Sequence, residues 1–214
     1  DDVLSVVADG WEASGTALTL SDVLDRVARD HDYALVVGHP GARIPHVTDG
    51  ADVHDPVVRV DGENFDADAA LDAIEEAEPY VTLGTLVDEI KRSDRTEYAG
   101  AIATFTGRVR AKEHEEDEYT TSLTFEKYDG VAEERMAEIE ADLEAREGVE
   151  DVLMHHRIGR IEAGEDIVFV VVLAGHREEA FRTVEDGIDR LKDVVPIFKK
   201  EITTDESYWV HERQ

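Results

Sequence analysis

The chain has 214 residues and a formal net charge of −30, with 52 acidic side chains against 22 lysines and arginines. Such an excess of negative charge excludes nonspecific binding to nucleic acid, because the phosphates would be repelled. Cysteine is absent, which excludes disulfides and thiolate chemistry, and no apolar run is long enough to span a bilayer. We therefore predict a cytoplasmic protein that binds neither nucleic acid nor membrane. The acidic excess, with arginine as the main cation, is typical of proteins that work in high salt, where screening weakens self-repulsion.

Residues 1–78 are predicted to form a first, α/β unit. Apolar runs predict three buried strands, at residues 3–7, 33–38 and 57–60. Helical spacing predicts two helices, one beginning near Thr19 or Ser21 and one over residues 66–77. Strand, helix and strand in this order indicate a parallel α/β layer.

Residues 79–214 are predicted to form a second, α+β unit. Its predicted elements, in chain order, are a helix at 85–90, strands at 98–105 and 119–128, a helix at 131–146, strands at 152–159 and 167–173, a helix at 181–192 and a strand at 197–202. The unbroken apolar run 167–173 is expected to be the central strand. The helix 131–146 is expected to bury a stripe made of Val131, Met136, Ile139 and Leu143.

Two positions in the second unit could contact an anion. Arg108 and Arg110 flank Val109 after a strand, so strand alternation predicts that both arginines project to one face. There they could fork onto an anionic group, or neutralise the acidic loop that follows. His176 and Arg177 stand where the central strand passes into a helix, and the exposed N–H groups of a helix start favour anions.

No metal site is predicted. His155 and His156 are adjacent in a strand, so their side chains point to opposite faces and cannot both bind one ion. The run Lys112–Glu118 contains one histidine among acidic residues, but a solvated loop is the better interpretation. The loop after the second predicted strand also holds side chains that could touch a ligand and are more typical of an ordinary polar loop, namely His39, Arg43 and His46.

Three of the six lysines fall within the stretch Leu191–Glu201. Lys192 is expected at the end of a helix, Pro196 stops the helical pattern, and Lys199 and Lys200 follow on a strand. In an acidic protein such local cations indicate a bound anion or a lysine used in chemistry. The alternative is that they are solvated charges that offset the negative end of the helix dipole.

In the first unit, the helix and the segment Asp32–His39 that follows it resemble the later half of a P-loop nucleotide-binding domain. They are similar to the molybdopterin-guanine dinucleotide accessory family, MobB. No Gly-x-x-x-x-Gly-Lys-Ser/Thr motif occurs in the chain, so the resemblance implies a partial α/β P-loop-like unit that lacks the P-loop. Since the chain begins at Asp1, in the approach to a strand, we expect a processed or trimmed piece, with the motif either lost or upstream.

The second unit contains an ordered set of segments: Phe105–Arg110, Leu123–Tyr128, His156–Gly159, Gly175–Phe181, Leu191–Lys192, Pro196–Glu201 and Trp209. With this set it resembles the large, catalytic subunit of molybdopterin synthase, the MoaE family. The resemblance implies an α/β hammerhead fold and a homodimer within a heterotetramer. It also implies a ubiquitin-like small subunit that carries sulfur as a C-terminal Gly-Gly thiocarboxylate. We interpret the whole chain as a haloarchaeal fusion of a MobB-like unit and a synthase unit.

The same resemblance implies the reaction and the site. Two carrier-borne sulfurs convert cyclic pyranopterin monophosphate into the dithiolene molybdopterin, and the sulfurtransferase needs no cofactor or metal of its own. By position in the family's motifs, Lys192 and Lys199 become the catalytic lysines. The implied substrate contacts are Arg108, Val109, Arg110, His176, Arg177, Lys200 and Glu201.

Two other functions stay open on the sequence. The chain could be a scaffold, or a target, to which ubiquitin-like carriers are attached by isopeptide bonds at Lys192 or Lys199. It could also be a nucleotide-linked accessory of molybdopterin-guanine dinucleotide formation, although the missing P-loop counts against this. The sequence does not reveal which small subunit is the partner.

Overall fold

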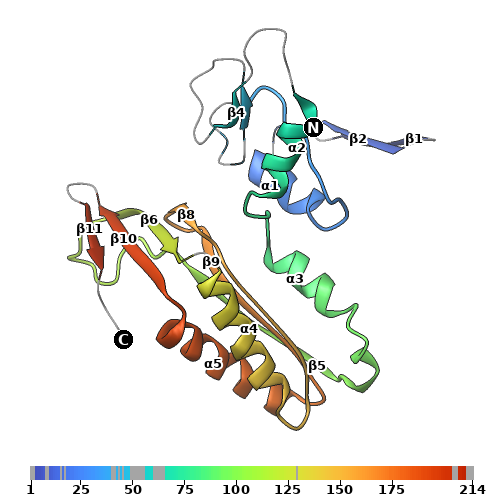
Figure 1. The fold of residues 1–214 in the computed structure, drawn as a ribbon, viewed down its shortest axis with the longest axis vertical. Coiled ribbons are helices and arrows are strands. Elements are labelled where there is room, and N and C mark those ends of the chain that lie inside the picture. The colour runs from blue at the N-terminus through green and yellow to red at the C-terminus, as the bar shows by residue number, and fades with distance from the viewer. Residues whose placement is uncertain are drawn as a thin grey trace. The chain divides into compact units, whose positions relative to one another are not determined.

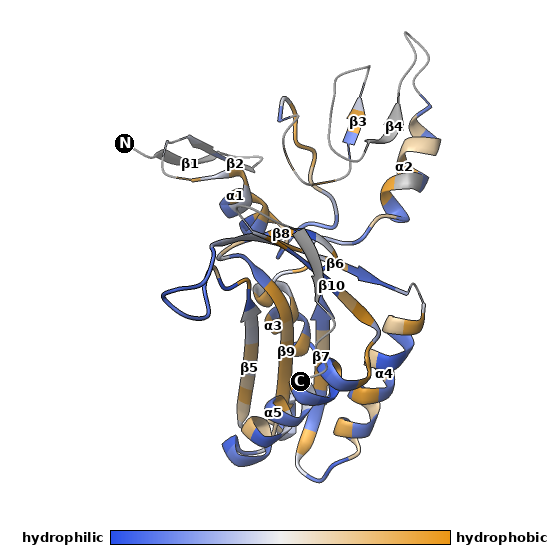
Figure 2. Cartoon of the chain, turned by 90° about the vertical axis from the view of Figure 1, so that its left-hand side faces the viewer, coloured by the Kyte–Doolittle hydropathy of each residue, from blue (hydrophilic) through white to orange (hydrophobic). Residues whose placement is uncertain are grey.

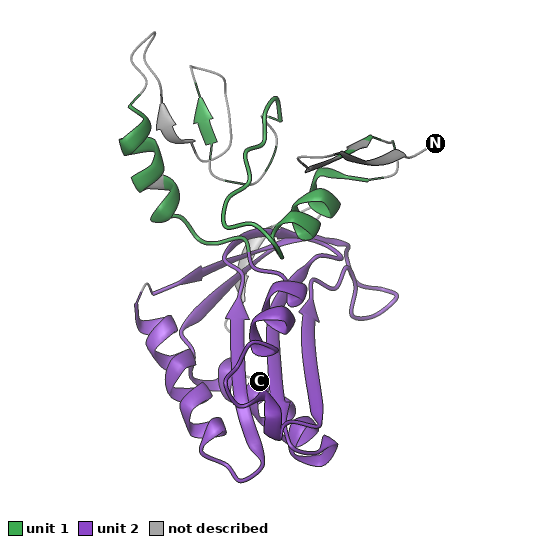
Figure 3. Cartoon of the chain, turned by 90° about the vertical axis from the view of Figure 1, so that its right-hand side faces the viewer, with its two compact units in different colours: residues 1–80 green, residues 81–214 purple. Residues whose placement is uncertain are grey.

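The structure is a computed structural model of the chain, and it describes residues 3–7, 10–14, 16, 18–39, 42, 44, 46–48, 56–59, 66–128, 130–203 and 207–210. The chain divides into two compact units, residues 1–80 and 81–214, where the sequence predicted a boundary after residue 78 (Figure 1; Figure 3). Among the described residues, none of the helices has the length and apolar character needed to cross a membrane.

The first unit contains the two predicted helices. Helix α1 (Leu20–Val27) begins with a capping box, in which the hydroxyl of Thr19 accepts from the N–H of Asp22 at 3.2 Å and the carboxylate of Asp22 accepts from the N–H of Thr19 at 2.7 Å. Helix α2 (Ala67–Glu75) begins at Asp66, whose side chain accepts from the N–H of Ala69 at 3.0 Å. Both helix starts are therefore set by local side chains that the sequence displays.

The strands of the first unit differ from the predicted parallel layer. Strand β1 (Val3–Val7) pairs antiparallel with β2 (Gly10–Ser14), and the parallel pair consists of β3 (His46–Thr48) and β4 (Pro56–Arg59). The prediction of a buried strand at residues 33–38 is wrong, because this segment is irregular and Leu35 is 93% exposed. An apolar run forms a strand only where a neighbour pairs with its backbone groups, and within the described residues this segment has no such neighbour.

One of the two sheets of the second unit has the order β5-β9-β7 and is antiparallel. Strand β5 spans Ala101–Arg108, after a 3-10 turn at Thr96–Tyr98; β9 spans Asp166–Ala174 and β7 spans Val149–His156. The apolar run predicted as the central strand is β9, and Figure 2 shows its continuous apolar character. The prediction of a central strand at 167–173 is confirmed.

Helices cover both faces of this sheet, which is why β9 is apolar at successive positions. Helix α3 (Leu83–Ile90) packs Leu86 and Ile90 against Phe169, Val171 and Leu173 on one face. On the other face, helix α5 (Arg177–Val194) packs against the alternate residues of β9, and helix α4 (Val131–Glu144) packs beside it against β7. Alternation along β9 therefore divides its side chains between two apolar cores.

The other sheet of this unit has the order β11-β10-β6-β8, also antiparallel. These strands span Ser207–Val210, Ile197–Thr203, Thr120–Lys127 and Gly159–Glu162, respectively. Leu123 and Phe125 of β6 and Ile161 of β8 are buried in the same core as the inner faces of α4 and α5. One apolar core thus joins the two sheets.

One residue of the expected buried stripe, Val131, lies on the surface, and so does the apolar Phe181. Val131 is 45% exposed because it is the first residue of α4, and the buried positions of this helix are Ala132, Ile139 and Leu143. Phe181 of α5 is 66% exposed. The buried neighbour of Phe181 on α5 is the small Ala180, which belongs to the core.

The outer edge of β7 is closed by two glutamates of α4. Glu140 accepts from the N–H of Met154 at 2.6 Å, and Glu144, one helical turn on, accepts from the N–H of Val152 at 3.2 Å. Burial, with the nearby carboxylates of Glu144 and Asp151 adding to it, raises the pKa of Glu140 to about 7. Burial also raises the pKa of Glu144. The two side chains satisfy edge N–H groups that a further strand would otherwise pair with.

Candidate functional site

The lysine stretch bridges the end of a helix and the start of a strand, as the sequence predicted. Lys192 lies in the last turn of α5 and is exposed. The helix ends at Val194, and β10 begins at Ile197 after Pro196. Lys199 is half-buried on β10. The helix end therefore has a cation in its last turn, which the negative end of the helix dipole favours.

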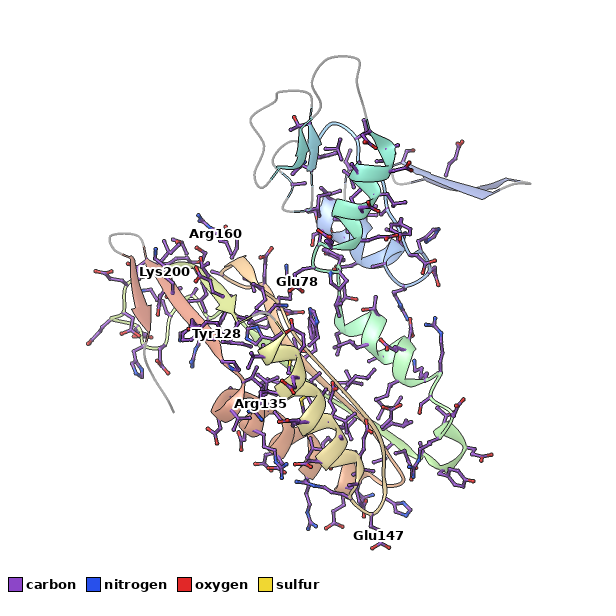
Figure 4. The ribbon with its side chains drawn as sticks, in the orientation of Figure 1. Glu78, Tyr128, Arg135, Glu147, Arg160 and Lys200 are labelled. Carbon is purple, nitrogen blue, oxygen red and sulfur yellow. The ribbon has the colours of Figure 1, made fainter. Side chains whose placement is uncertain are left out.

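The two lysines of β10 belong to opposite faces of their sheet. Lys199 pairs with the buried Phe125 of β6, so it shares the core-side face. Lys200 pairs with Thr124, which on its other side pairs with Arg160 of β8. Figure 4 labels Lys200 and Arg160 on these flanking strands. The resemblance implies that Lys199 and Lys200 are both site residues. Because adjacent strand residues alternate, one chain presents them on opposite faces, and the role of Lys200 stays a prediction.

Glu201 shares the face of Lys199 and is held in place by a side-chain hydrogen bond. The hydroxyl of Thr120, on β6, donates to its carboxylate. Beside it, the hydroxyl of Thr121 donates to the carbonyl of Ile202 at 2.9 Å. These contacts fix the pairing of β10 on β6, so the position of Lys199 is set by the sheet rather than by a loop.

Arg108 and Arg110 are both exposed, and the residue between them is buried. Val109 is in the core, which confirms that the arginines lie on the other side of the chain from it. Nε of Arg108 lies 3.2 Å from a carboxylate oxygen of Asp166. Nη2 of Arg110 lies 3.3 Å from Glu113, in the acidic loop. The alternative that an arginine neutralises this loop therefore describes Arg110, while Arg108 is held by a neighbouring strand.

His176 and Arg177 stand at the start of α5, as predicted, and both side chains are exposed. The turn before them is tight. A Cβ added to Gly100 would meet the carbonyl oxygen of Gly175 at 2.6 Å, and the N–H of Gly175 donates to Gly148 at 2.9 Å. Main-chain contact thus fixes the direction in which α5 starts.

A single chain does not bring all the predicted site residues together. In the β5–β9 ladder Ala101 pairs with Ala174 at one end, and Arg108 pairs with Asp166 at the other. Helix α5 starts at the Ala174 end and folds back along both strands over 18 residues, about 27 Å. His176 and Arg177 therefore lie at one end of the sheet. Arg108 lies at the opposite end. Lys192, in the last turn of α5, lies toward this same end. The predicted substrate contacts therefore lie at two ends of the sheet within one chain, and their common pocket stays a prediction for the homodimer.

The side chains of His155, His156 and His46 contact other groups of the protein. His155 stacks on Phe169 with centroids 6.5 Å apart, and His156 meets Phe125 edge-on at 4.9 Å, so the two rings point to opposite faces. Burial lowers the pKa of His156 to about 4. In the first unit, Nε2 of His46 lies 2.6 Å from the carbonyl oxygen of Ala42, four residues earlier in the chain. Among the residues that the structure describes, no group of three His, Asp or Glu side chains could hold a metal.

Of the loop residues named with His46, His39 is exposed, and Arg43 lies outside the described residues. The sequence also missed groups beside the cations. Asp166 and the carbonyl of Gly164 contact Arg108, and Tyr128 meets Phe198 edge-on at 5.3 Å, with both rings partly exposed. The first contact depends on strand register, for which the sequence carries no local signal. The aromatic pair could have been found from strand alternation on β6 and β10.

A family model described as MoaE protein matches residues 81–194. A Haloferax volcanii protein, "Probable molybdopterin synthase", is 59% identical over 205 residues, which are 95% of this chain and 78% of the relative. The "Molybdopterin synthase catalytic subunit" of Yersinia pestis is 37% identical over 126 residues, 59% of this chain and 82% of the relative. A crystal structure of molybdopterin synthase from Staphylococcus aureus matches with a TM-score of 0.51 and 36% identity, over 54% of this chain and 83% of that one. The chain therefore belongs to the MoaE family, the catalytic subunits of molybdopterin synthase.

Proposed function

We propose that this chain is the sulfurtransferase of molybdopterin synthesis. It acts on cyclic pyranopterin monophosphate, which is substrate and not cofactor, and makes the dithiolene of molybdopterin. The sulfur comes from the C-terminal Gly-Gly thiocarboxylate of a ubiquitin-like small subunit. The observation that carries the proposal is that α5 runs toward the Arg108 end of its sheet and ends in exposed Lys192, shortly before Lys199 on β10, in a strongly acidic chain. Cations in this setting suit a substrate that bears a cyclic phosphate.

The lysines fit the chemistry of the transfer. Each transfer forms a bond from the sulfur to a substrate carbon, breaks a bond from that carbon to oxygen, and breaks the bond from the sulfur to the acyl carbon of the carrier. The displaced oxygen leaves protonated as water or stays on the phosphate. Water supplies the oxygen of the carboxylate that is regenerated. Negative charge builds on the acyl group as water adds, and a nearby ammonium stabilises it. We assign Lys192 to acid–base work or substrate activation, since it is exposed, and half-buried Lys199 to holding the substrate and the carrier tail.

A second copy of the chain supplies His176 and Arg177 in this proposal. Within one chain these residues lie at the far end of the sheet from Arg108. Among the described residues β5 pairs with β9 alone, so its other edge has backbone groups to offer. A two-fold, antiparallel pairing of two β5 edges would set the Ala101 end of one copy beside the Arg108 end of the other. Exposed Ile102 lies on β5 itself and exposed Phe181 lies on α5, which packs against β5, and we expect the pairing to bury both.

The small subunit is the other proposed partner. A solved Helicobacter pylori structure holds subunits 1 and 2 of the molybdopterin-converting factor in one complex, and we propose the same kind of pairing here. The tail of such a carrier has to reach Lys192 and Lys199. The partly exposed rings of Tyr128 and Phe198 provide apolar surface for the carrier on the face of the sheet that Lys200 shares, opposite to Lys199. The assembly is then a heterotetramer in the cytoplasm.

The test is product formation from purified components. The chain is mixed with thiocarboxylated small subunit and the cyclic pterin, and the dithiolene is measured. Lys192→Ala and Lys199→Ala are each expected to reduce turnover by about 100-fold. Lys91→Ala is the matched control, since it removes an ammonium from an exposed pair with Asp88 on α3. Wild-type turnover in both active-site variants would refute the lysine assignment.

Conjugation is a second candidate function, and the exposure of Lys192 at a helix end favours it. The carrier tail lies beside this lysine in the proposed complex, so an isopeptide bond is chemically accessible. Mass spectrometry of the protein from cells is expected to show a Gly-Gly remnant on Lys192 if the chain is a conjugation target. Tryptic peptides that cover Lys192 and Lys199 without any remnant would exclude this role.

For the first unit we propose a partial MobB-like origin, fused ahead of the synthase unit. The Haloferax volcanii relative supports the fusion, because its match covers 95% of this chain and so extends through both units. No P-loop motif is present to cradle a phosphate. Calorimetry with GTP is therefore expected to show no binding heat, and saturable binding would instead favour the nucleotide-linked accessory function.

A further inference from the structure

The guanidinium of Arg108 is held along one edge by the turn between β8 and β9. Nε lies 3.2 Å from Oδ1 of Asp166, and Nη2 donates to the carbonyl of Gly164. Nε and one Nη make up the side-on edge of a guanidinium, and the two Nη groups make up its end-on edge. The turn thus occupies the side-on edge with two separate oxygens. Within the described part of the chain Nη1 has no protein partner, and the side chain is 64% exposed.

The turn that holds Arg108 is itself fixed by backbone hydrogen bonds. The N–H of Val109 donates to the carbonyl of Glu165 at 2.9 Å, and the N–H of Gly164 donates back to the carbonyl of Val109 at 2.8 Å. Gly164 has φ of +90°, a conformation that favours glycine. From the other side, Nη1 of Arg157 donates to the carbonyl of Asp166 at 2.8 Å. The position of the Asp166 backbone is therefore set by both neighbouring strands.

The partner of Arg110 has no comparable support. Glu113 is three residues further along the same loop, and both side chains of that pair are more than 60% exposed. Exposed pairs of this kind contribute little and do not hold a geometry. Asp166 differs because it is less exposed, at 43%, and because it pairs with Arg108 across two strands, next to the bulge between Gly107 and Arg108. The backbone that carries its carboxylate is fixed by the hydrogen bonds of the turn.

We propose that Asp166 is a positioning residue for Arg108. It holds the guanidinium so that the end-on pair of N–H groups meets the anionic group of the substrate bidentately. The inference rests on the proposed function, in which Arg108 contacts the phosphate of the pterin. An arginine that is already ordered loses less side-chain entropy on binding than a free one. Asp166 makes no bond to the substrate, so it acts on substrate affinity and not on the chemical step.

The test compares Asp166→Ala and Asp166→Asn with the wild type in the product assay, at saturating small subunit. Ordering one long side chain costs up to about 1.5 kcal/mol, so Asp166→Ala is expected to raise KM for the pterin about tenfold, with kcat within about twofold of wild type. Asp166→Asn keeps an acceptor oxygen, and its KM is expected to rise about threefold. Glu138→Ala is the matched control, because it removes a carboxylate paired with Arg135 on the outer face of α4.

A double variant separates positioning from a general structural role. If Asp166 acts through Arg108, the KM of Arg108→Ala/Asp166→Ala equals that of Arg108→Ala alone. An unchanged KM in Asp166→Ala, or a double variant that shows the full product of both effects, would overturn the proposal. Thermal melting checks folding, and the near-isosteric Asp166→Asn serves if the alanine variant does not fold. No dithiolene from the wild type would overturn the proposed function and this inference together. Wild-type turnover with an unchanged KM in the variants overturns this inference alone.

Discussion

Replacing Glu140 by glutamine should stabilise the protein, and only at the higher end of the pH range. The carboxyl of Glu140 is mostly buried beside β7, and its pKa rises from 4.5 to about 7. At 1.36 kcal/mol per unit, keeping this group ionised in the folded state costs at most about 3.4 kcal/mol. Part of the carboxyl still meets solvent, so we expect about 2 kcal/mol after screening. Glutamine keeps an oxygen that can accept from the N–H of Met154 and has no charge to bury.

The sign follows from the raised pKa. Below the unfolded value the carboxyl is protonated in both states and costs nothing; above pH 7 it is ionised in both, and the folded state bears the full cost. The gain of Glu140→Gln is therefore expected to be largest near pH 8.5 and small near pH 5. The gain is the difference in the free energy of unfolding between variant and wild type, measured by urea titration at fixed salt and monitored by circular dichroism. His156 titrates in the opposite sense, since burial lowers its pKa to about 4, so only the difference between variant and wild type isolates Glu140.

Glu138→Gln on the same helix is the control, because Glu138 is half-exposed and paired with Arg135. It should change the free energy of unfolding by less than about 0.5 kcal/mol at either pH. Equal stabilisation by Glu140→Gln at both pH values would refute the reasoning, since a pH-independent gain cannot come from a buried charge. A lower stability of Glu140→Gln than of wild type at pH 8.5 would also refute the reasoning, since it would mean that the ionised carboxylate binds the N–H groups of the β7 edge better than an amide does.

Gly100→Ala should lower the free energy of unfolding by more than about 2 kcal/mol, because the added Cβ would lie 2.6 Å from the main-chain oxygen of Gly175. The control is Gly175→Ala, whose added Cβ would have no neighbour closer than 3.7 Å, and this variant should melt near the wild-type temperature. Phe181→Ser should leave the melting temperature within a few degrees of wild type but shift the chain toward monomer in light scattering. Val131→Ser, which also removes an exposed apolar side chain but from α4, should not. Stability of the wild type should fall as the pH drops from 6.5 to 4 through the protonation of His156, and His156→Gln should weaken that fall in acid titrations.

Local features of the fold could be predicted from the sequence. Thr19 and Asp66 cap their helices where the pattern indicated, and the apolar run at β9 is the central strand. These features depend on neighbouring residues along the chain, so one sequence contains their cause. The prediction of a strand at 33–38 was wrong because a strand requires a partner strand, and distant segments of the chain decide which strands pair.

The sequence names candidate site residues but does not give their arrangement. Lys192, Lys199 and Arg108 stay predictions as site residues, and the separation of His176 and Arg177 from Arg108 depends on the β5–β9 register. Arg108 pairs with Asp166, the first residue of β9, whereas His176 and Arg177 follow Ala174, its last residue, so the length of the strand separates them. Motif order along the chain cannot show this, since both segments adjoin the same strand.

Closure of the β7 edge by Glu140 and Glu144 matters most where charge repulsion is weakest. In dilute buffer a net charge of −30 keeps molecules apart. At molar salt the Debye length shrinks to about 3 Å, so that repulsion no longer reaches a neighbouring molecule. A hydrogen bond to a main-chain N–H acts at contact distance and is not screened away. In brine, then, it is helix α4, and not the acidic surface, that keeps one sheet from growing onto another and the protein from aggregating along this edge.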